Sequence, residues 1–302
     1  MVLSEVLILS LAVLVLAGCQ AGRVSDDRDS SGAAGAGDEA ADPDAVEEPV
    51  YYTQEGTDPT WAYILENEMI PLLRNSTEGV TGSRIRVNRE LVEQGPYAHL
   101  PIERNIRIHT LGNSFIRREH FDRWSRWYQE DGNTQVFRLF EGETNVRNRR
   151  ANAARIEAFS AHGWKHGDGW QEWVGTVTLV KPTGSIFQVK APGPVDWGVM
   201  ISSGGTDGVN IQRRRGERTR VATGRQFHLR VRDNGHDYEV YINGRLEATG
   251  AWDRQGLRSS FRWGMYVGGR RVPEDDHMIL FTGATVNPPA ETEAESPAGS
   301  TP

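Results

Sequence analysis

The sequence predicts an all-β fold, a β-sandwich of jelly-roll kind, on two observations. From about residue 170 onward, short runs of alternating apolar and polar residues follow one another, separated by turn signals and with no helical pattern between them. Glycine is frequent, at 33 of 302 residues, as a fold with many turns requires. Nine Trp, nine Phe and eight Tyr are ample for the core of a single large domain.

The first 19 residues have the pattern of an export signal. Residues 6–16 are apolar but too few for a comfortable membrane span, and they end in Leu16-Ala17-Gly18-Cys19. This tetrapeptide resembles a bacterial lipobox, which implies cleavage before Cys19, a lipid on its sulfur and an exported protein anchored to the cell envelope, at the outer membrane or the cell surface. Two alternatives stay open. Cys19 could be incidental to an ordinary signal peptide, and Glu5, where such signals carry Lys or Arg, could reflect a misplaced start codon or a non-functional signal.

Both ends of the exported chain are predicted to be disordered. Residues 20–50 and the tail 288–302 hold almost no large apolar residues, so neither can offset the entropy cost of ordering. A flexible segment like residues 20–50 spans roughly 30 Å, enough to tether a domain to a lipid surface. Cys19 is the only cysteine, so no disulfide can form within the chain and stability must come from packing.

The charge of the chain is unevenly distributed. The formal net charge is −7, yet residues 20–50 hold nine acidic residues against two Arg, and residues 51–287 hold 32 Lys and Arg against 28 Asp and Glu. Of those 32 cations 29 are Arg, whose planar fork matches carboxylate, sulfate or phosphate. A polyanionic partner and a GC-rich genome explain this excess equally well.

Residues 51–104 are expected to form an extension packed on the sandwich. Asp58-Pro59-Thr60 can start a short N-terminal helix, because apolar residues follow it at helical spacing and Pro71 limits its length. We expect this helix to pack against the outside of the sheet.

Alternating runs predict the strands that follow, and glycine turns separate them. Between two of these runs lies the aromatic cluster of Trp124, Trp127 and Tyr128, either a hydrophobic plug under a loop or a platform for a sugar ring. Further on, Asn243-Gly244 is a tight-turn dipeptide. The predicted strands are residues 84–87, 105–109, 135–140, 173–180, 185–190, 197–201 and 209–213, with a hairpin of 227–232 and 238–242.

Three runs, residues 154–159, 186–190 and 261–266, are the centre of the functional hypothesis. As strands, they send successive side chains to opposite faces. One face then carries Arg155, Glu157, Gln188, Lys190, Arg262 and Tyr266, and the other carries Ile156, Phe187, Val189, Phe261, Trp263 and Met265. The polar set contains more charged and hydrogen-bonding groups than a sheet face that only contacts solvent requires. We therefore expect the three strands to lie side by side and to form a ligand-binding surface.

Two resemblances follow from these residues. The hairpin around Asp233-Asn234-Gly235 resembles the concanavalin A-like lectin/glucanase sandwich. Arg155-x-Glu157, Gln188-x-Lys190 and Phe261-Arg262-x-Gly264-x-Tyr266 together resemble the signature strands of the jelly-roll polysaccharide lyases, the alginate lyase family numbered seven and its glucuronan lyase relatives. The similarity covers about residues 105–287 of a jelly-roll domain expected at 51–287, and it implies cleavage of a uronate-containing polysaccharide by β-elimination.

The resemblance also implies roles for single residues. Arg155 and Gln188 would bind the substrate carboxylate, Tyr266 would transfer a proton at the glycosidic oxygen, and Arg262 would be the basic residue beside it. Removal of the C5 proton of a uronate needs donors where the enolate charge develops, together with a base and an acid, and these residue types suit that chemistry. The substrate-binding set is expected to be Glu157, Arg262, His228 and Trp127.

One position departs from the family pattern, because Lys190 stands where the family usually has His. Lys190 could act as a base only if neighbouring cations and burial favoured its neutral form, and otherwise it would simply bind an anionic sugar. Alternatively, Tyr266 could serve as both base and acid. A third alternative takes the imidazole from His109, His162, His166 or His228. Arg155 and Glu157 could also be a structural ion pair, and His228 a surface residue.

Other chemistries lack their signals. The sequence has no phosphate-binding glycine loop, no serine nucleophile elbow and no zinc-spaced His pair, and residues 162–168 read more readily as a glycine-rich loop than as a metal site. We expect no required cofactor, with room for a structural calcium ion, no nucleic-acid partner and a monomer. The alternatives to a lyase are a non-catalytic carbohydrate-binding module of the same fold and a glycoside hydrolase, for which only Glu157 is a good carboxylate candidate.

Overall fold

Two antiparallel sheets pack face to face, with the hydrophobic core between them. The computed structural model describes residues 48–67, 69–73, 77–111, 113–144, 153–192, 197–213, 216, 218–268 and 272–289. Aromatic rings of the two sheets meet in the core, where the ring centroid of Trp173 lies 4.9 Å from that of Phe187 and 5.8 Å from that of Trp263. All three side chains are buried. The predicted all-β jelly-roll sandwich is confirmed.

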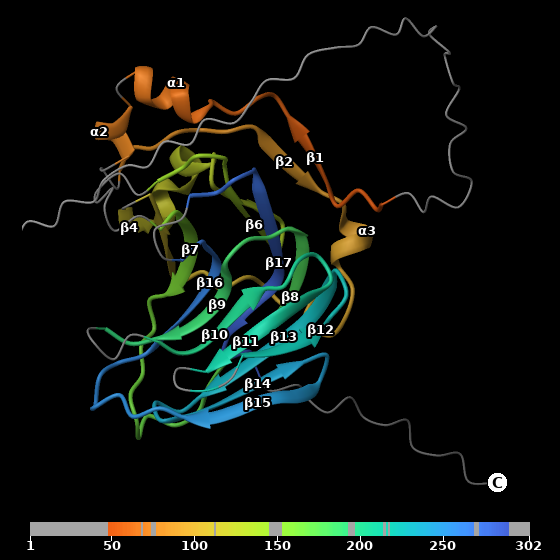
Figure 1. Cartoon of the computed structure of the whole chain (residues 1–302), viewed down its shortest axis with the longest axis vertical. Helices are drawn as coiled ribbons and strands as arrows, with labels where there is room; N and C mark the ends of the chain where they lie inside the picture. Colours follow the sequence, from red (N-terminus) through yellow and green to blue (C-terminus); the bar gives the residue numbers. More distant parts are fainter. Residues whose placement is uncertain are drawn as a thin grey trace, which may run out of the picture. The chain divides into compact units, whose positions relative to one another are not determined.

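The first sheet contains the three strands on which the functional hypothesis rests. Among the described residues its strand order is β12-β11-β10-β9-β16-β7-β3-β4, and all neighbours are antiparallel. The strands are β3 (Ile106–Thr110), β4 (Asn113–Arg117), β7 (Arg155–Ser160), β9 (Ser185–Lys190), β10 (Trp197–Ser203), β11 (Gly208–Arg213), β12 (Arg218–Ala222) and β16 (Ser260–Tyr266). Since β16 lies between β9 and β7, the three runs are side by side as expected (Figure 1).

The second sheet backs the first. Its order in the described part of the chain is β15-β14-β13-β8-β17-β6-β5, again antiparallel throughout. The strands are β5 (Tyr128–Asp131), β6 (Thr134–Leu139), β8 (Gln171–Lys181), β13 (Gln226–Asp233), β14 (Asp237–Ile242), β15 (Arg245–Ala251) and β17 (His277–Val286). The predicted hairpin is β13 and β14. Asn243 and Gly244 both have positive φ, as the predicted tight turn between β14 and β15 requires.

Part of the segment before β3 covers the outer face of the second sheet. The helix expected on the outside of the sheet does not, because Ile64 and Leu73 contribute to the main hydrophobic core instead. The strands of this segment, β1 (Tyr52–Glu55) and β2 (Arg84–Val87), form a separate two-stranded ribbon, followed by α3 (Arg89–Val92). In Figure 1 this ribbon and the helices before β2 lie together in orange at the end opposite β14 and β15. The ribbon and α3 share a second hydrophobic cluster with β6 and β17, formed by Tyr51, Ile85, Val87, Val92, Val136, Met278 and Leu280.

The predicted N-terminal helix is divided in two. Thr60 caps α1 (Trp61–Glu66), because its hydroxyl accepts a hydrogen bond from the Tyr63 backbone N–H at 3.1 Å. The chain then leaves helical geometry and re-enters it at α2 (Ile70–Leu73). Pro71 explains the break, since its ring would clash with the carbonyl of Asn67 in a continuous helix. A turn of 3-10 helix, η1 (Arg118–Trp124), precedes β5.

The export signal with Cys19 lies outside the described residues, as do most of the predicted tether and the tail from residue 290. No helix in the described ranges is long and apolar enough to cross a membrane.

Candidate functional site

Polar side chains of β7, β9 and β16 share one face of the first sheet, which we call the polar face. In the β16–β7 ladder Tyr266 pairs with Arg155, and in the β16–β9 ladder Arg262 pairs with Gln188. The alternate residues of the same strands point into the core, where Ile156, Phe187, Val189, Phe261, Trp263 and Met265 are at most 1% exposed. The face assignment made from the sequence is therefore correct for these three strands.

Glu157 connects the polar groups of this face. Its carboxylate is buried, with the residue only 3% exposed, and Oε1 accepts a hydrogen bond of 2.8 Å from Nε2 of Gln188. The other oxygen, Oε2, lies 3.7 Å from Nη1 of Arg155. One carboxylate thus orients a carboxamide from β9 and a guanidinium on β7, two strands that are not adjacent.

Gly264 leaves the space in which Gln188 can reach Glu157 to form their hydrogen bond. Gly264 lies on β16, the strand between β7 and β9, and pairs directly with Glu157 of β7. Because it has no side chain, nothing at this position blocks the Gln188 carboxamide from reaching Glu157. The φ of Gly264, +131°, is a conformation that residues with a Cβ rarely adopt. A Cβ built here would lie 2.2 Å from the carbonyl oxygen of Ile156. Glycine is required at this position on steric grounds.

Arg155 also contacts Tyr266. Its Cζ lies 4.3 Å from the centroid of the Tyr266 ring, within cation–π distance. Two buried atoms of this group, Nε of Arg155 and Oε2 of Glu157, have no hydrogen-bond partner among the described residues. A buried donor without a partner is costly unless something binds it, so the guanidinium has capacity for an anionic ligand.

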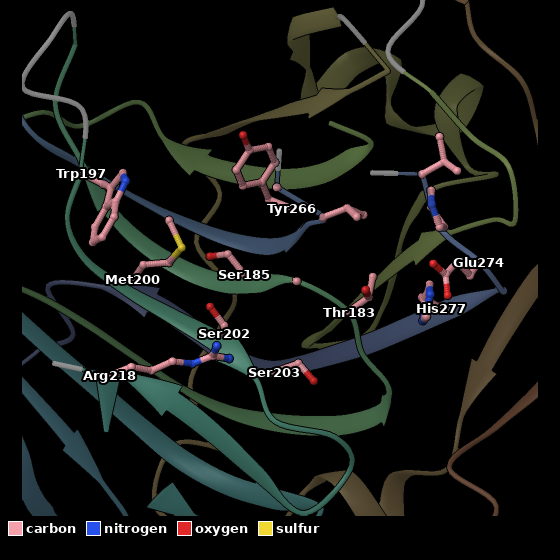
Figure 2. A pocket seen from close by; sticks show the side chains of 15 residues that line it. Thr183, Ser185, Trp197, Met200, Ser202, Ser203, Arg218, Tyr266, Glu274 and His277 are labelled. Atoms are coloured by element: carbon pink, nitrogen blue, oxygen red, sulfur yellow. The ribbon is translucent and has the colours of Figure 1, made fainter. Parts of the chain in front are cut away.

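A cavity of about 620 Å³ lies on the Tyr266 side of this cluster. Figure 2 shows the Tyr266 ring standing up from its strand, with Trp197 and Met200 at one end of the cavity and Glu274 and His277 at the other. Burial lowers the pKa of His277 below its usual value, which favours the neutral imidazole. Other lining residues include Thr183, Ser185, Ser202, Ser203 and Arg218. The cavity is therefore polar and aromatic, and large enough for a sugar unit.

Lys190 lies at the opposite end of these strands from Tyr266. It pairs with Ser260, at the start of β16, whereas Tyr266 ends that strand. The separation of six residue steps along β16 corresponds to roughly 20 Å of strand. Lys190 therefore faces a different part of the polar face.

Of the four histidines considered from the sequence, His109 lies on the polar face. It is half-buried and pairs directly with Glu157 in the β3–β7 ladder. His162 is exposed and contacts Gln171 at 3.1 Å, and His166 is exposed beside His236. The sequence alone could not select His109, because only the strand order brings β3 next to β7.

Two expected substrate-binding residues lie elsewhere. Trp127 is fully buried, and its indole N–H donates to Glu143 at 2.8 Å, so the aromatic cluster is a plug rather than a sugar platform. His228 is on β13 in the second sheet, where its ring packs under Gly95 and edge-on to Tyr97, 6.2 Å between centroids. Burial lowers its pKa. Neither side chain is on the polar face, because each belongs to the core or to the second sheet.

No group of three or more His, Cys, Asp or Glu within the described ranges could hold a metal ion.

Comparison with known proteins gives a likeness at the level of structure. No protein-family model matches the sequence, and neither does any curated protein. The structure is similar to alginate lyase AlgAT5 of polysaccharide lyase family 7, with 17% identity, a TM-score of 0.48 and coverage of 61% of this chain and 94% of that one. The alginate lyase from Corynebacterium sp. gives 15% identity, a TM-score of 0.49 and coverage of 61% and 93%. The family 7 alginate lyase AlyA1 from Zobellia galactanivorans gives 12% identity and a TM-score of 0.45, with coverage of 78% of this chain and 93% of that one. Identities this low do not carry an activity from those enzymes to this chain.

Proposed function

We propose that this protein cleaves an acidic, uronate-containing polysaccharide by β-elimination on the polar face of its first sheet. The observation that supports this most is the joining of Arg155, Gln188 and Tyr266 into one group through Glu157 and a ring contact. These side chains come from three different strands. A guanidinium and a carboxamide can donate hydrogen bonds to the uronate carboxylate and a phenol can transfer a proton, which are two of the functions that β-elimination requires.

The chemistry proceeds without a co-reactant. A base takes the proton from C5, the electron pair of that C–H bond forms the C4–C5 double bond, and the C4–O bond breaks with its electrons on the leaving oxygen. That oxygen takes a proton from an acid. Negative charge develops on the uronate carboxylate, where the donors of Arg155 and Gln188 would stabilise it.

Tyr266 is proposed as the acid, because its phenol borders the large cavity and its ring stacks on Arg155. For the base we favour His109 over Lys190. His109 pairs with Glu157, which is two residues along β7 from Arg155, the partner of Tyr266. Lys190 pairs with Ser260, which is six residues along β16 from Tyr266. Tyr266 acting as both base and acid stays the alternative.

Glu157 is proposed as a positioning residue. It is buried, and both of its oxygens face the groups that would bind the substrate carboxylate. The same burial counts against a glycoside hydrolase, in which a pair of accessible carboxyl groups flanks the glycosidic bond.

A non-catalytic carbohydrate-binding module is the second candidate. It is favoured by Lys190, since a lysine stands where the resembled lyases usually have an imidazole. Arg155, Gln188 and Tyr266 would then only bind the sugar acid.

Export and anchoring belong to the same proposal. A polysaccharide substrate lies outside the cell, and Leu16-Ala17-Gly18-Cys19 has the pattern that would hold the enzyme at the envelope. Replacing Cys19 by Ala should abolish incorporation of a labelled fatty acid and release the protein from membranes. Unchanged membrane attachment of that variant would contradict the anchor.

The decisive assay incubates the purified protein with alginate, glucuronan and other polyuronates. β-Elimination creates a double bond conjugated with the carboxylate, which absorbs in the ultraviolet. Growth of that absorbance supports the lyase. Binding without it indicates the module, and new reducing ends without it indicate hydrolysis.

The base is tested by His109→Gln, with His228→Gln as the matched control in the second sheet. We expect the first to lose turnover and the second to keep it. Full turnover in His109→Gln would leave Tyr266 as the base.

A further inference from the structure

The outer face of the second sheet carries a row of charged side chains beside one exposed tryptophan. Alternate residues of β13 are buried in the core, so Arg230 and Arg232 point outward. In the strand ladders Arg232 pairs with Glu172 of β8 on one side and with Glu239 of β14 on the other. We call the group of Trp170, Glu172, Arg230, Arg232 and Glu239 the Trp170 surface.

Trp170 supplies the apolar part of this surface. Among the described residues it is the only tryptophan that is exposed, at 40%. Cζ of Arg232 lies 4.7 Å from the centroid of its ring, which holds the ring in place by a cation–π contact. A Cβ built at Gly167 or Gly169, in the turn before Trp170, would meet nothing within 4 Å. The ring is therefore fixed on one side, and the turn beside it is open to solvent.

The charges of the Trp170 surface compensate one another. Oε2 of Glu172 lies 2.7 Å from Nη2 of Arg230 and 3.5 Å from Nε of Arg232. Oε2 of Glu239 lies 2.8 Å from Nη1 of Arg232. Two cations and two anions give no net charge, so the surface has no electrostatic preference for an acidic or a basic ligand. These partly exposed groups can still exchange hydrogen bonds with hydroxyl groups.

The composition of this surface suits a sugar better than a second copy of the chain. On β13–β15 and at the start of β8, Trp170 and Leu246 are the only large apolar residues of the described part that are exposed. A stable protein interface has a larger apolar core than two such side chains provide. A pyranose needs less, because one aromatic ring covers its C–H face and a few fixed polar groups bind its hydroxyls.

We propose that the Trp170 surface is a non-catalytic binding site for a neutral pyranose of a polysaccharide. Trp170 stacks on the C–H face of the sugar, and the carboxylates and guanidinium groups beside it bind the hydroxyls. The site is on the second sheet, whereas the polar face is on the first. It therefore goes beyond the proposed function, since it attaches the protein to an uncharged glycan independently of any cleavage.

The test measures binding of three neutral hexasaccharides, cellohexaose, laminarihexaose and mannohexaose, to the full chain by calorimetry. Trp170→Ala is compared with Tyr63→Ala, which removes an aromatic side chain from a residue of α1 that is 51% exposed. The wild type and Tyr63→Ala should bind at least one of the three sugars equally, and Trp170→Ala should bind it about tenfold more weakly. Trp170→Tyr keeps a ring for stacking and should recover most of the loss.

Thermal unfolding checks that each variant is folded, and affinity for the neutral sugar should not change with added salt. Absence of binding, or equal affinities of Trp170→Ala and Tyr63→Ala for all three sugars, would overturn the proposal. An oligouronate that requires Trp170 and is weakened by salt would overturn the neutral ligand. A dimer in sedimentation that Trp170→Ala abolishes would assign the surface to a second copy instead. Neutral sugars carry no uronate, so failure of the lyase assay leaves this result unaffected.

Discussion

At the scale of single residues, the chemistry depends on how Arg155 is held. Its guanidinium lies between the carboxylate of Glu157 and the ring of Tyr266. Lysine at this position keeps the charge but loses the planar fork and most of the ring contact. We expect Arg155→Lys to lower kcat/KM on a polyuronate by about a hundredfold, as removal of a donor at developing charge does.

Thermal unfolding of Arg155→Lys is expected to stay close to that of the wild type, because the side chain is on the sheet surface and not in the core. A variant with wild-type kcat/KM would show that Arg155 is a structural partner of Glu157 and nothing more.

Glu143 gives a prediction on pH. Burial of its side chain raises its pKa from 4.5 to about 7, even though Arg126 lies 3.5 Å away and opposes the shift. The folded state therefore holds this proton more tightly than the unfolded state. Stability should fall as pH rises from about 4.5 to about 7, by at most roughly 3 kcal/mol.

The measurement is the free energy of unfolding in denaturant across this range, for the wild type and for Glu143→Gln. The variant lacks the titrating group. The difference in free energy of unfolding between the wild type and the variant should therefore change with pH between about 4.5 and about 7 and be constant above that range. Lowered pKa values of His228 and His277 act in the opposite direction but cancel in that difference. A flat difference throughout would mean that Glu143 is ionised in the fold.

At the scale of elements, β16 depends on Gly264. Its positive φ and the 2.2 Å approach of a Cβ to the Ile156 carbonyl leave no room for alanine in the middle of the sheet. Gly264→Ala is expected to cost about 3 kcal/mol or more, or to prevent folding. Gly256→Ala is the control, since Gly256 also has a positive φ, of +73°, but nothing lies within 4 Å of its Cβ position. Chemical denaturation should give Gly264→Ala a lower free energy of unfolding than Gly256→Ala, because only Gly264→Ala introduces the steric clash. Equal free energies of unfolding would contradict the requirement for glycine at position 264.

Strand period explains both what the sequence predicted at this scale and what it missed. Alternation assigned the faces of β7, β9 and β16 correctly, because each has one apolar and one polar side. It gave no strand for β17, in which neighbouring residues Met278, Ile279, Leu280 and Phe281 are all buried. Met278 and Leu280 face the cluster under the N-terminal segment and the other two face the core, so alternation is absent.

The candidate site could be predicted only within strands. The role of Glu157 as the link between Arg155 and Gln188 and the nearness of His109 both depend on strand order. Strand order comes from long-range pairing, which the local sequence pattern does not contain. Trp127 was misassigned because a cluster of aromatic residues has the same composition in a core and on a sugar-binding surface.

At the scale of the whole molecule, the N-terminal segment is attached to the sandwich by a buried ion pair. Asp58 and Arg138 approach to 2.7 Å, and their side chains are 6% and 2% exposed. Asp58→Asn would leave the Arg138 guanidinium buried beside a neutral group, which costs about 3–5 kcal/mol. The exposed pair of Arg86 and Glu55 on the β1–β2 ribbon is the control, and Glu55→Gln should cost less than about 1 kcal/mol.

Both variants should keep kcat below their unfolding temperatures, because Asp58 and the β1–β2 ribbon lie against the second sheet and the candidate site is on the first. A loss of turnover in folded Asp58→Asn would show that this segment influences the polar face.

The most direct test of the central claim compares the wild type with Tyr266→Phe on one polyuronate, following the ultraviolet absorbance of the new double bond and, separately, oligouronate binding by calorimetry. Tyr241→Phe, a half-buried phenol in the second sheet, is the matched control. The account predicts that the wild type and the control release unsaturated product, and that Tyr266→Phe binds the oligouronate but releases none. Wild-type product formation by Tyr266→Phe, or no unsaturated product from the wild type on any polyuronate, would contradict it.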